Sequence, residues 1–226
     1  MPNDVQELHC SLCESKNLLE LTHTQISSRK FYGCKHCDLI FVPELQHPSL
    51  GQEISRYKNH QNQEFNDGYT SFLSQIVNPV YELILKDRKV KRILDYGCGE
   101  GQALSKILAQ KNIKVTNYDP YFHVNEKVFS EKWDLIFSTE VWEHFRNPKI
   151  EIEKLLRIID QNGSCAVMTQ LHPGIQNSDF FQEWWYVRDL THLCFYSEKT
   201  FQYLAQRYKL NIQLIESPVV IFDKSV

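Results

Sequence analysis

The stretch Arg92-Ile-Leu-Asp-Tyr-Gly-Cys-Gly-Glu-Gly101 decides the fold that this chain can adopt. Its apolar residues form a short strand that ends at Asp95 and runs directly into Gly97, Gly99 and Gly101. Glycine lets the backbone turn sharply there and lets a ligand approach without a Cβ atom in the way. A helix is predicted to begin immediately afterwards, so free N–H groups and the positive end of a helix dipole lie beside the turn. Strand, glycine turn and helix in this order predict a binding site for a nucleotide-like ligand.

Strands and helices alternate along the chain around this turn. Strands are predicted from short apolar runs, and helices from apolar residues that recur every three or four positions. The strands fall at residues 92–95, 113–118, 133–138 and 164–169, and the helices at residues 69–86 (bent at Pro79), 101–111, 148–160 and 197–208. Residues 210–215 and 219–222 predict a closing hairpin. This order predicts an α/β fold, with a Rossmann-like, doubly wound, mostly parallel sheet and an antiparallel C-terminal hairpin.

The spacing of the glycines narrows the class of ligand. A dinucleotide fingerprint, G-x-G-x-x-G/A, needs a small residue at position 102, where the chain has Gln102. The chain instead reads D-x-G-x-G-x-G from Asp95 to Gly101, which resembles motif I of the class I S-adenosylmethionine-dependent methyltransferases. The resemblance implies that Asp95 and the three glycines bind the methionine part of the cofactor. It also implies that Asp119, at the end of the next strand, binds the ribose hydroxyls.

The resemblance extends over roughly residues 70–226. It includes Trp133-Asp-Leu-Ile-Phe-Ser-Thr-Glu-Val-Trp-Glu-His144, which supplies the fourth strand of that family, and we count Glu140 with the cofactor residues. The chain departs from the family pattern between Asp119 and Trp133. Members of the family usually have a helix, a strand and another helix there, but this segment is too short for all three. The wall around the adenine must therefore be abbreviated, and Phe122 and Phe129 are the candidates to contact it.

Four of the seven cysteines form two CxxC pairs near the amino terminus. Each pair can place two thiolates around one metal ion, and two pairs complete a tetrahedral zinc site with no open position. Residues 1–42 are therefore predicted to form a zinc ribbon with a structural zinc ion, held by Cys10, Cys13, Cys34 and Cys37. Redox disulfides and fortuitous spacing are the alternatives.

The whole layout resembles an uncharacterised group of bacterial methyltransferases that carry a four-cysteine ribbon at the amino terminus. The stretches that carry this resemblance are Arg56–Asn62, Tyr118–Tyr121 and Trp185–His192. Between the ribbon and a methyltransferase domain predicted at residues 69–226, residues 43–68 form either a plain linker or a lid. As a lid, this segment would fold Tyr57, His60 and Asn62 over the cofactor.

Residues after the fourth and fifth strands are expected to shape the acceptor pocket, because ligands of this fold bind at the carboxyl ends of the strands. Methyl transfer needs a base only when the acceptor is protonated, and His192 with Asp189 is the first candidate for that role. His144 is the second candidate. In the alternative interpretation these side chains tie loops together and the aromatic ones pack in the core. The other pocket candidates are Glu140, Glu143, His172, Phe180–Tyr186 and Arg188.

Composition limits the compartment and the class of partner. The net charge of −3 and the pI of about 6.3 give no basic excess for binding a polyanion. No apolar run reaches the roughly 20 residues that span a bilayer. The amino terminus lacks the pattern of a signal peptide. We therefore expect a cytoplasmic protein without a membrane partner.

The sequence thus predicts an enzyme that transfers a methyl group from S-adenosylmethionine to a small-molecule acceptor by in-line displacement. Two alternatives stay open: an RNA methyltransferase guided by the zinc ribbon, and a catalytically inactive zinc-ribbon interaction protein. The acceptor atom (oxygen, nitrogen or carbon) and the oligomeric state are not predicted.

Overall fold

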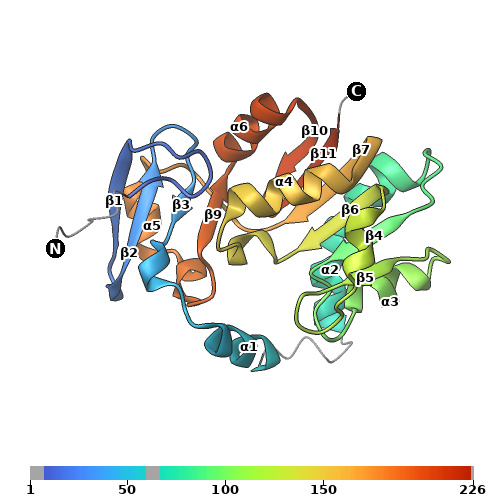
Figure 1. The fold of residues 1–226 in the computed structure, drawn as a ribbon, viewed down its shortest axis with the longest axis horizontal. Helices are drawn as coiled ribbons and strands as arrows, with labels where there is room; N and C mark the ends of the chain where they lie inside the picture. The colour runs from blue at the N-terminus through green and yellow to red at the C-terminus, as the bar shows by residue number, and fades with distance from the viewer. Residues whose placement is uncertain (1–7, 60–66, 225–226) are drawn as a thin grey trace.

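The computed structural model describes residues 8–59 and 67–224, which form two sheets (Figure 1). The larger sheet has six strands, in the order β10 (Leu210–Glu216), β11 (Val219–Lys224), β7 (Ile159–Met168), β6 (Trp133–Thr139), β4 (Ile93–Tyr96) and β5 (Thr116–Tyr118). The last four are parallel to one another, whereas the hairpin of β10 and β11 is antiparallel to its neighbours. The predicted α/β fold with an antiparallel C-terminal hairpin is confirmed.

Helices cover both faces of this sheet. α2 (Asp67–Val80) and α3 (Ala103–Ala109) pack on one face, and α4 (Pro148–Ile158) and α6 (Glu198–Tyr208) pack on the other. Successive residues of β6 illustrate the reason, since side chains alternate between the two faces of a strand. Leu135 and Phe137 share a buried cluster with α2 and α3, whereas Ile136 belongs to the cluster of α4 and α6. Both faces of the central strands are therefore apolar, as a doubly wound sheet requires.

The ends of the helices follow local signals in the sequence. Asn147 caps α4 by accepting a backbone N–H at 3.2 Å, and Pro148 takes the first helical position. Ser197 caps α6 through a capping box. α2 continues into a π-helical turn over Tyr81–Leu85, which begins two positions after Pro79, where the sequence predicts a bend.

The connection between β5 and β6 is as short as the sequence predicts. Its helical element in the described chain is a 3-10 turn over Glu126–Ser130. Val128 of this turn is buried and accepts a hydrogen bond from the indole N–H of Trp133 at 2.9 Å. Among the described residues no strand lies beyond β5, which therefore forms one edge of the sheet.

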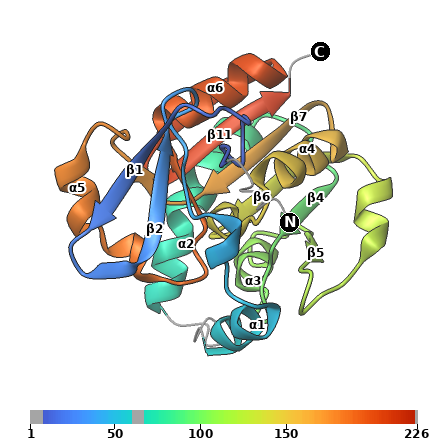
Figure 2. The ribbon, with the colours of Figure 1, turned by 60° about the vertical axis from the view of Figure 1, so that its left-hand side comes forward.

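The smaller sheet joins the cysteine-rich segment to a distant part of the chain. Its order is β1 (Leu18–His23), β2 (Ile26–Cys34), β3 (Ile40–Phe41), β9 (Cys194–Ser197) and β8 (Leu171–His172). β3 and β9 are antiparallel, with Ile40 opposite Phe195. Figure 2 shows β1 and β2 on the near side of the molecule, in front of the larger sheet. The sequence does not predict β8 or β9. The domain boundary expected at residue 42 directly follows β3, which pairs with β9 in this shared sheet.

α1 (Leu50–Asn59) follows the ribbon and lies along the lower edge of the molecule in Figure 1. His60 and Asn62 of the predicted lid lie outside the described residues. Within the described ranges, no helix combines the length and the apolar character needed to cross a membrane.

Candidate functional site

A cavity of about 660 Å³ lies at the carboxyl ends of β4, β5 and β6. This is the end of an open α/β sheet at which ligands bind. α1 and α2 contribute Tyr57, Tyr69 and Phe72 to its wall. All of the predicted cofactor residues also border it: Asp95, Gly97, Gly99, Gly101, Asp119 and Glu140.

Two glycines of the turn have a conformation that other residues rarely adopt. The φ angle is +82° at Gly97 and +62° at Gly99. A Cβ atom at Gly97 would lie 2.3 Å from Cγ2 of Val141, so the turn packs too closely there for any side chain. A Cβ atom at Gly99 would meet no other atom within 4 Å. Gly97 therefore serves the close packing of the turn, whereas Gly99 leaves its backbone open to a ligand in the cavity.

Asp95 presents a buried carboxylate to the cavity. The residue is 1% exposed, and within the described chain its Oδ1 atom accepts no hydrogen bond. Burial, together with the charge of Asp119, raises the pKa of Asp95 to about 7. A buried acceptor without a donor is costly, so the group is suited to a cationic or hydrogen-bond-donating ligand.

Asp119 ends β5 and is held by the backbone. Its Oδ1 atom accepts the N–H groups of Tyr121 and Phe122 at 2.8 and 3.0 Å. Its Oδ2 atom accepts the N–H of Gly99 at 3.1 Å. A carboxylate offers about four acceptor positions, so these bonds leave room for about one more donor. Asp119 thus braces the glycine turn in addition to facing the cavity.

Glu140 follows β6 in a strained conformation, with a φ angle of +53°. Burial and the neighbouring carboxylate of Glu143 raise the pKa of Glu140 to about 9. The side chain therefore carries a proton at neutral pH. The hydroxyl of Tyr186 lies 3.5 Å from Glu140 Oε2 and donates to Glu143 Oε1 at 2.6 Å.

The structure brings His144 and His192 together at the cavity wall, with ring centroids 4.9 Å apart. His144 Nδ1 lies 2.9 Å from the carbonyl oxygen of Thr191, and His192 Nδ1 lies 2.8 Å from that of Tyr186. Burial lowers the pKa of His192 to about 3, with a further contribution from His144, so the ring is neutral at physiological pH. A group with so low a pKa is a weak base.

Asp189 does not accompany His192 into the cavity. Its carboxylate accepts the backbone N–H and the hydroxyl of Thr191 at 2.9 and 2.7 Å. It also accepts two bonds from Arg56 of α1, at 3.0 and 2.8 Å. Its link to His192 is through the backbone, where the His192 N–H donates to the Asp189 carbonyl at 3.2 Å. The carboxylate thus ties the loop to α1.

The aromatic residues of Phe180–Tyr186, predicted to shape the acceptor pocket, lie outside the cavity wall. Phe181 and Trp184 are buried against the ribbon sheet, where Phe181 contacts Phe31 with ring centroids 5.2 Å apart. Of Phe180–Tyr186, His172 and Arg188, no member borders the cavity. α5 (Ser178–Glu183) packs on β1 of the ribbon sheet, whereas the side chains of Phe180, Trp185 and Arg188 are exposed to solvent. Of the two adenine candidates, Phe122 borders the cavity and Phe129 does not.

α1 closes one side of the cavity through contacts that the sequence does not predict. Arg146, directly after the Glu-His stretch, forms a 2.7 Å ion pair with Glu53 of α1. The Tyr121 hydroxyl donates to the same carboxylate at 3.3 Å. Tyr57, predicted as part of a lid, contacts His144 edge to face with ring centroids 5.2 Å apart. An ion pair between residues so far apart in sequence leaves no local pattern that could have identified it.

The charge of the cavity wall is predominantly acidic. Two lysine or arginine side chains border it within the described chain, Arg146 and Lys154. They face six carboxyl groups, of which all but the protonated Glu140 can contribute negative charge: Glu53, Asp95, Glu100, Asp119, Glu140 and Glu151. Such a wall favours cationic ligands and disfavours the phosphates of a nucleic acid.

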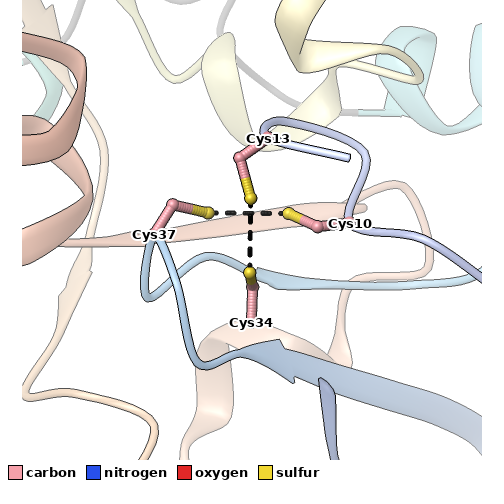
Figure 3. Close-up of side chains that lie close together, drawn as sticks. All are labelled: Cys10, Cys13, Cys34 and Cys37. Carbon is pink, nitrogen blue, oxygen red and sulfur yellow. Dashed lines mark hydrogen bonds between the residues drawn. The ribbon is translucent and has the colours of Figure 1, made fainter. Parts of the chain in front are cut away.

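The four cysteines of the ribbon converge on one point (Figure 3). The Sγ atoms of Cys10 and Cys37 are 3.5 Å apart, and those of Cys13 and Cys34 are 3.4 Å apart. Four sulfurs around a zinc ion at 2.3 Å would be separated by about 3.8 Å. Each CxxC pair is followed by a residue with a φ angle of +62°, Glu14 or Asp38, whose N–H donates to the carbonyl of the first cysteine. The two matching turns present thiols in a geometry compatible with tetrahedral zinc.

Arg29 links the ribbon to the cavity loop. It projects from β2, is 7% exposed, and donates to the carbonyl oxygens of Val187, Asp189, Leu190 and His192. Burial lowers its pKa to about 10, which still leaves the guanidinium charged at neutral pH. The ribbon therefore holds the loop that carries His192.

Solved structures with a similar fold include methyltransferases. An O-methyltransferase family protein from Burkholderia thailandensis matches with a TM-score of 0.56 and 14% identity, over 80% of this chain and 64% of its own. This chain thus spans less than two thirds of the length of that protein. The magnesium protoporphyrin IX methyltransferase from Synechocystis PCC 6803, solved with bound SAH, matches with a TM-score of 0.51 and 14% identity, over 77% and 95%. At these identities the likeness concerns the fold. A comparison with curated proteins finds no match.

The family assignment rests on the sequence of the larger domain. The model of a family described as "Methyltransferase domain" matches residues 59–215, which is more than half of the chain. The matched range contains the glycine turn, His144, His192 and every strand of the parallel core. The chain therefore belongs to the methyltransferase-domain family.

Proposed function

We propose that this protein transfers the methyl group of S-adenosylmethionine to a small-molecule acceptor bound in the same cavity. The observation that carries the proposal is the buried carboxylate of Asp95 beside an open glycine turn. S-Adenosylmethionine supplies a methyl group already activated by a positively charged sulfur, and it also carries an ammonium group. An acidic wall with an unpartnered carboxylate oxygen suits both positive charges.

Different residues around the turn are suited to bind different parts of S-adenosylmethionine. Asp95 and Gly99 are suited to hold the amino acid end of the cofactor, since one offers an acceptor and the other an open backbone. Asp119, 20 residues after Gly99, has about one acceptor position left for a ribose hydroxyl. Phe122 is the aromatic side chain suited to contact the adenine at this edge.

The chemistry at the acceptor side relies on positioning. Methyl transfer is an in-line displacement, so holding the acceptor atom in line with the methyl group and excluding water supply much of the acceleration. Tyr57 and the ion pair of Glu53 with Arg146 close the cavity on that side. His192 is neutral but weakly basic, so it is poorly suited to deprotonate an acceptor.

RNA as the acceptor remains the second candidate, with less support. A polyanion would have to approach a cavity wall on which five ionisable carboxyl groups outnumber two cations. The ribbon is also engaged elsewhere, since Arg29 and β3 contact the loop and strand that follow residue 186. These contacts support a structural role of the ribbon. We further propose that Cys10, Cys13, Cys34 and Cys37 bind the zinc ion of that ribbon.

Calorimetry with S-adenosylmethionine tests the cofactor. We predict saturable binding to the full chain, weakened by about 1.5–3 kcal/mol in Asp119→Ala through lost hydrogen bonds to a charged group. Asp179→Asn, which alters an exposed carboxylate outside the cavity, serves as the control and should bind like the wild type. No binding at millimolar cofactor would sink the enzyme proposal.

The class of acceptor needs a separate experiment. The protein is incubated with cofactor carrying a labelled methyl group and with a cell extract divided into small molecules and RNA. We expect label in the small-molecule fraction. Label in RNA alone would favour the second candidate.

A further inference from the structure

A second cluster of metal-binding side chains lies at the inner wall of the cavity, separate from the four cysteines. Glu143, His144 and His192 each place one possible ligand atom within 4.8 Å of the other two. Two of these residues are adjacent in sequence and the third is 48 positions away. They meet because the Leu193 N–H donates to the carbonyl of Glu143 at 2.6 Å.

The tautomers of both histidines follow from their backbone contacts. A carbonyl oxygen only accepts, so His144 Nδ1 must donate to Thr191 at 2.9 Å and His192 Nδ1 to Tyr186 at 2.8 Å. In this tautomer the Nε2 atom carries no proton, and no hydrogen bond from residues 8–59 or 67–224 reaches the Nε2 atom of either ring. Metal-binding histidines commonly have this arrangement, in which the other ring nitrogen donates to a fixed acceptor.

The carboxylate of Glu143 has an oxygen without a partner. The residue is fully buried, with 0% exposure. Its Oε1 atom accepts the Tyr186 hydroxyl at 2.6 Å, whereas its Oε2 atom has no hydrogen-bond partner in the described chain. An unsatisfied carboxylate oxygen in the interior is strongly unfavourable unless a cation or a donor compensates it. Its neighbours in the cluster are two imidazoles whose protons point elsewhere, and the adjacent carboxyl of Glu140 is the group that can share a proton with it. A cation bound between Glu143 and the two Nε2 atoms would replace that proton and satisfy all three groups at once.

We propose that Glu143, His144 and His192 bind a divalent transition-metal ion. Two imidazole nitrogens and one carboxylate oxygen suit Mn²⁺, Fe²⁺ or Zn²⁺ better than Ca²⁺ or Mg²⁺. Tyr186 orients the carboxylate and the two carbonyls orient the rings, so the ligands are held before the ion arrives. His144 and His192 border the same cavity as the glycine turn, so an ion bound by them would lie at the wall of that cavity. Only the role of the ion depends on the proposed function. The ion can bind to these three side chains whether or not S-adenosylmethionine is present.

Binding of Mn²⁺ provides the test, because this ion has little affinity for a four-thiolate ribbon. Free Mn²⁺ is measured by electron paramagnetic resonance during titration of the full chain, and total zinc by elemental analysis. We expect about one Mn²⁺ per chain, or about one zinc beyond that of the ribbon. Glu143→Gln and His192→Gln should each weaken Mn²⁺ binding at least about tenfold or remove the extra zinc, as a lost ligand should.

Two controls separate loss of a ligand from loss of the fold. His47→Gln removes an imidazole outside the cluster and should retain Mn²⁺ binding. The ligand variants should retain their affinity for S-adenosylmethionine, so failure of this inference is distinguishable from failure of the proposed function. If a variant does not fold, the wild type suffices: Mn²⁺ should protect His144 and His192 from diethylpyrocarbonate, located by mass spectrometry. Absence of both ions from the wild type, or binding that is unchanged in the folded variants, would overturn the proposal.

Discussion

At the scale of single residues, Asp95 is the group whose ionisation matters most for the proposed cofactor. It is buried at the end of β4 and faces Asp119 from β5, while Tyr69 of α2 and Cys98 of the turn are the titratable groups that its charge affects. Burial and Asp119 raise its pKa from 3.8 to about 7. The folded protein therefore holds this proton more tightly than the unfolded chain, so ionisation of Asp95 lowers the stability of the ligand-free protein as the pH rises towards 7.

Binding of a cationic cofactor reverses this preference. We predict that the affinity for S-adenosylmethionine falls as the pH falls below about 7, approaching tenfold per pH unit, because the carboxylate must be ionised to compensate the cation. Calorimetry between pH 5.5 and pH 7.5 measures the effect. Asp95→Asn should bind more weakly at pH 7.5 and lose the dependence on pH. A variant with the same pH profile as the wild type would remove Asp95 from the cofactor site.

At the scale of elements, the loop between α5 and β9 is held by side chains from two elements that are distant in the sequence, β2 and α1. Its carbonyl oxygens receive hydrogen bonds from the buried guanidinium of Arg29 on β2, and its Asp189 pairs with Arg56 of α1 at 2.8 Å. The loop contributes His192 to the cavity. Two elements of the amino-terminal part thus determine where a residue of the carboxyl-terminal part lies.

Removal of Arg29 should loosen this loop. We predict that Arg29→Ala lowers the free energy of unfolding by about 2–4 kcal/mol, since hydrogen bonds of a charged group are lost and buried carbonyl oxygens are left without donors. Urea denaturation measures the loss, and hydrogen exchange should be faster in residues 187–192. Lys30→Ala, on the exposed face of the same strand, should change neither. Wild-type exchange in that loop would show that Arg29 does not hold it.

At the scale of the whole molecule, the ribbon and the methyltransferase sheet share their packing. β3 extends the ribbon sheet onto β9, and Asp38, beside the fourth cysteine, accepts the Ser197 hydroxyl at 2.6 Å. Ser197 is also the cap of α6. Disruption of the ribbon should therefore also displace β9 and the loop before it, which carries His192 at the cavity wall.

Loss of the metal from the ribbon should consequently destabilise the whole chain. A structural zinc contributes on the order of 10 kcal/mol to small zinc domains. We predict that Cys34→Ser abolishes zinc binding in the ribbon, lowers the melting temperature in a single transition and exposes residues 187–197 to hydrogen exchange. Cys165→Ala, a buried cysteine of β7, should keep the ribbon zinc. Two separate transitions, with the methyltransferase part melting at its wild-type temperature, would instead indicate an independent ribbon.

The sequence by itself determined the parts of this protein that local chemistry specifies. Alternating patterns predicted the parallel sheet, its helices and its C-terminal hairpin, and the spacing of glycines and cysteines predicted the turn at Asp95 and the two CxxC turns. All of these depend on residues within one element or one turn. Only the tertiary structure decided that β9 joins the ribbon, that Asp189 pairs with Arg56 and not with the His192 ring, and that Glu143, His144 and His192 meet. Each of these depends on contacts between segments far apart in the chain, which leave no periodic pattern in the sequence.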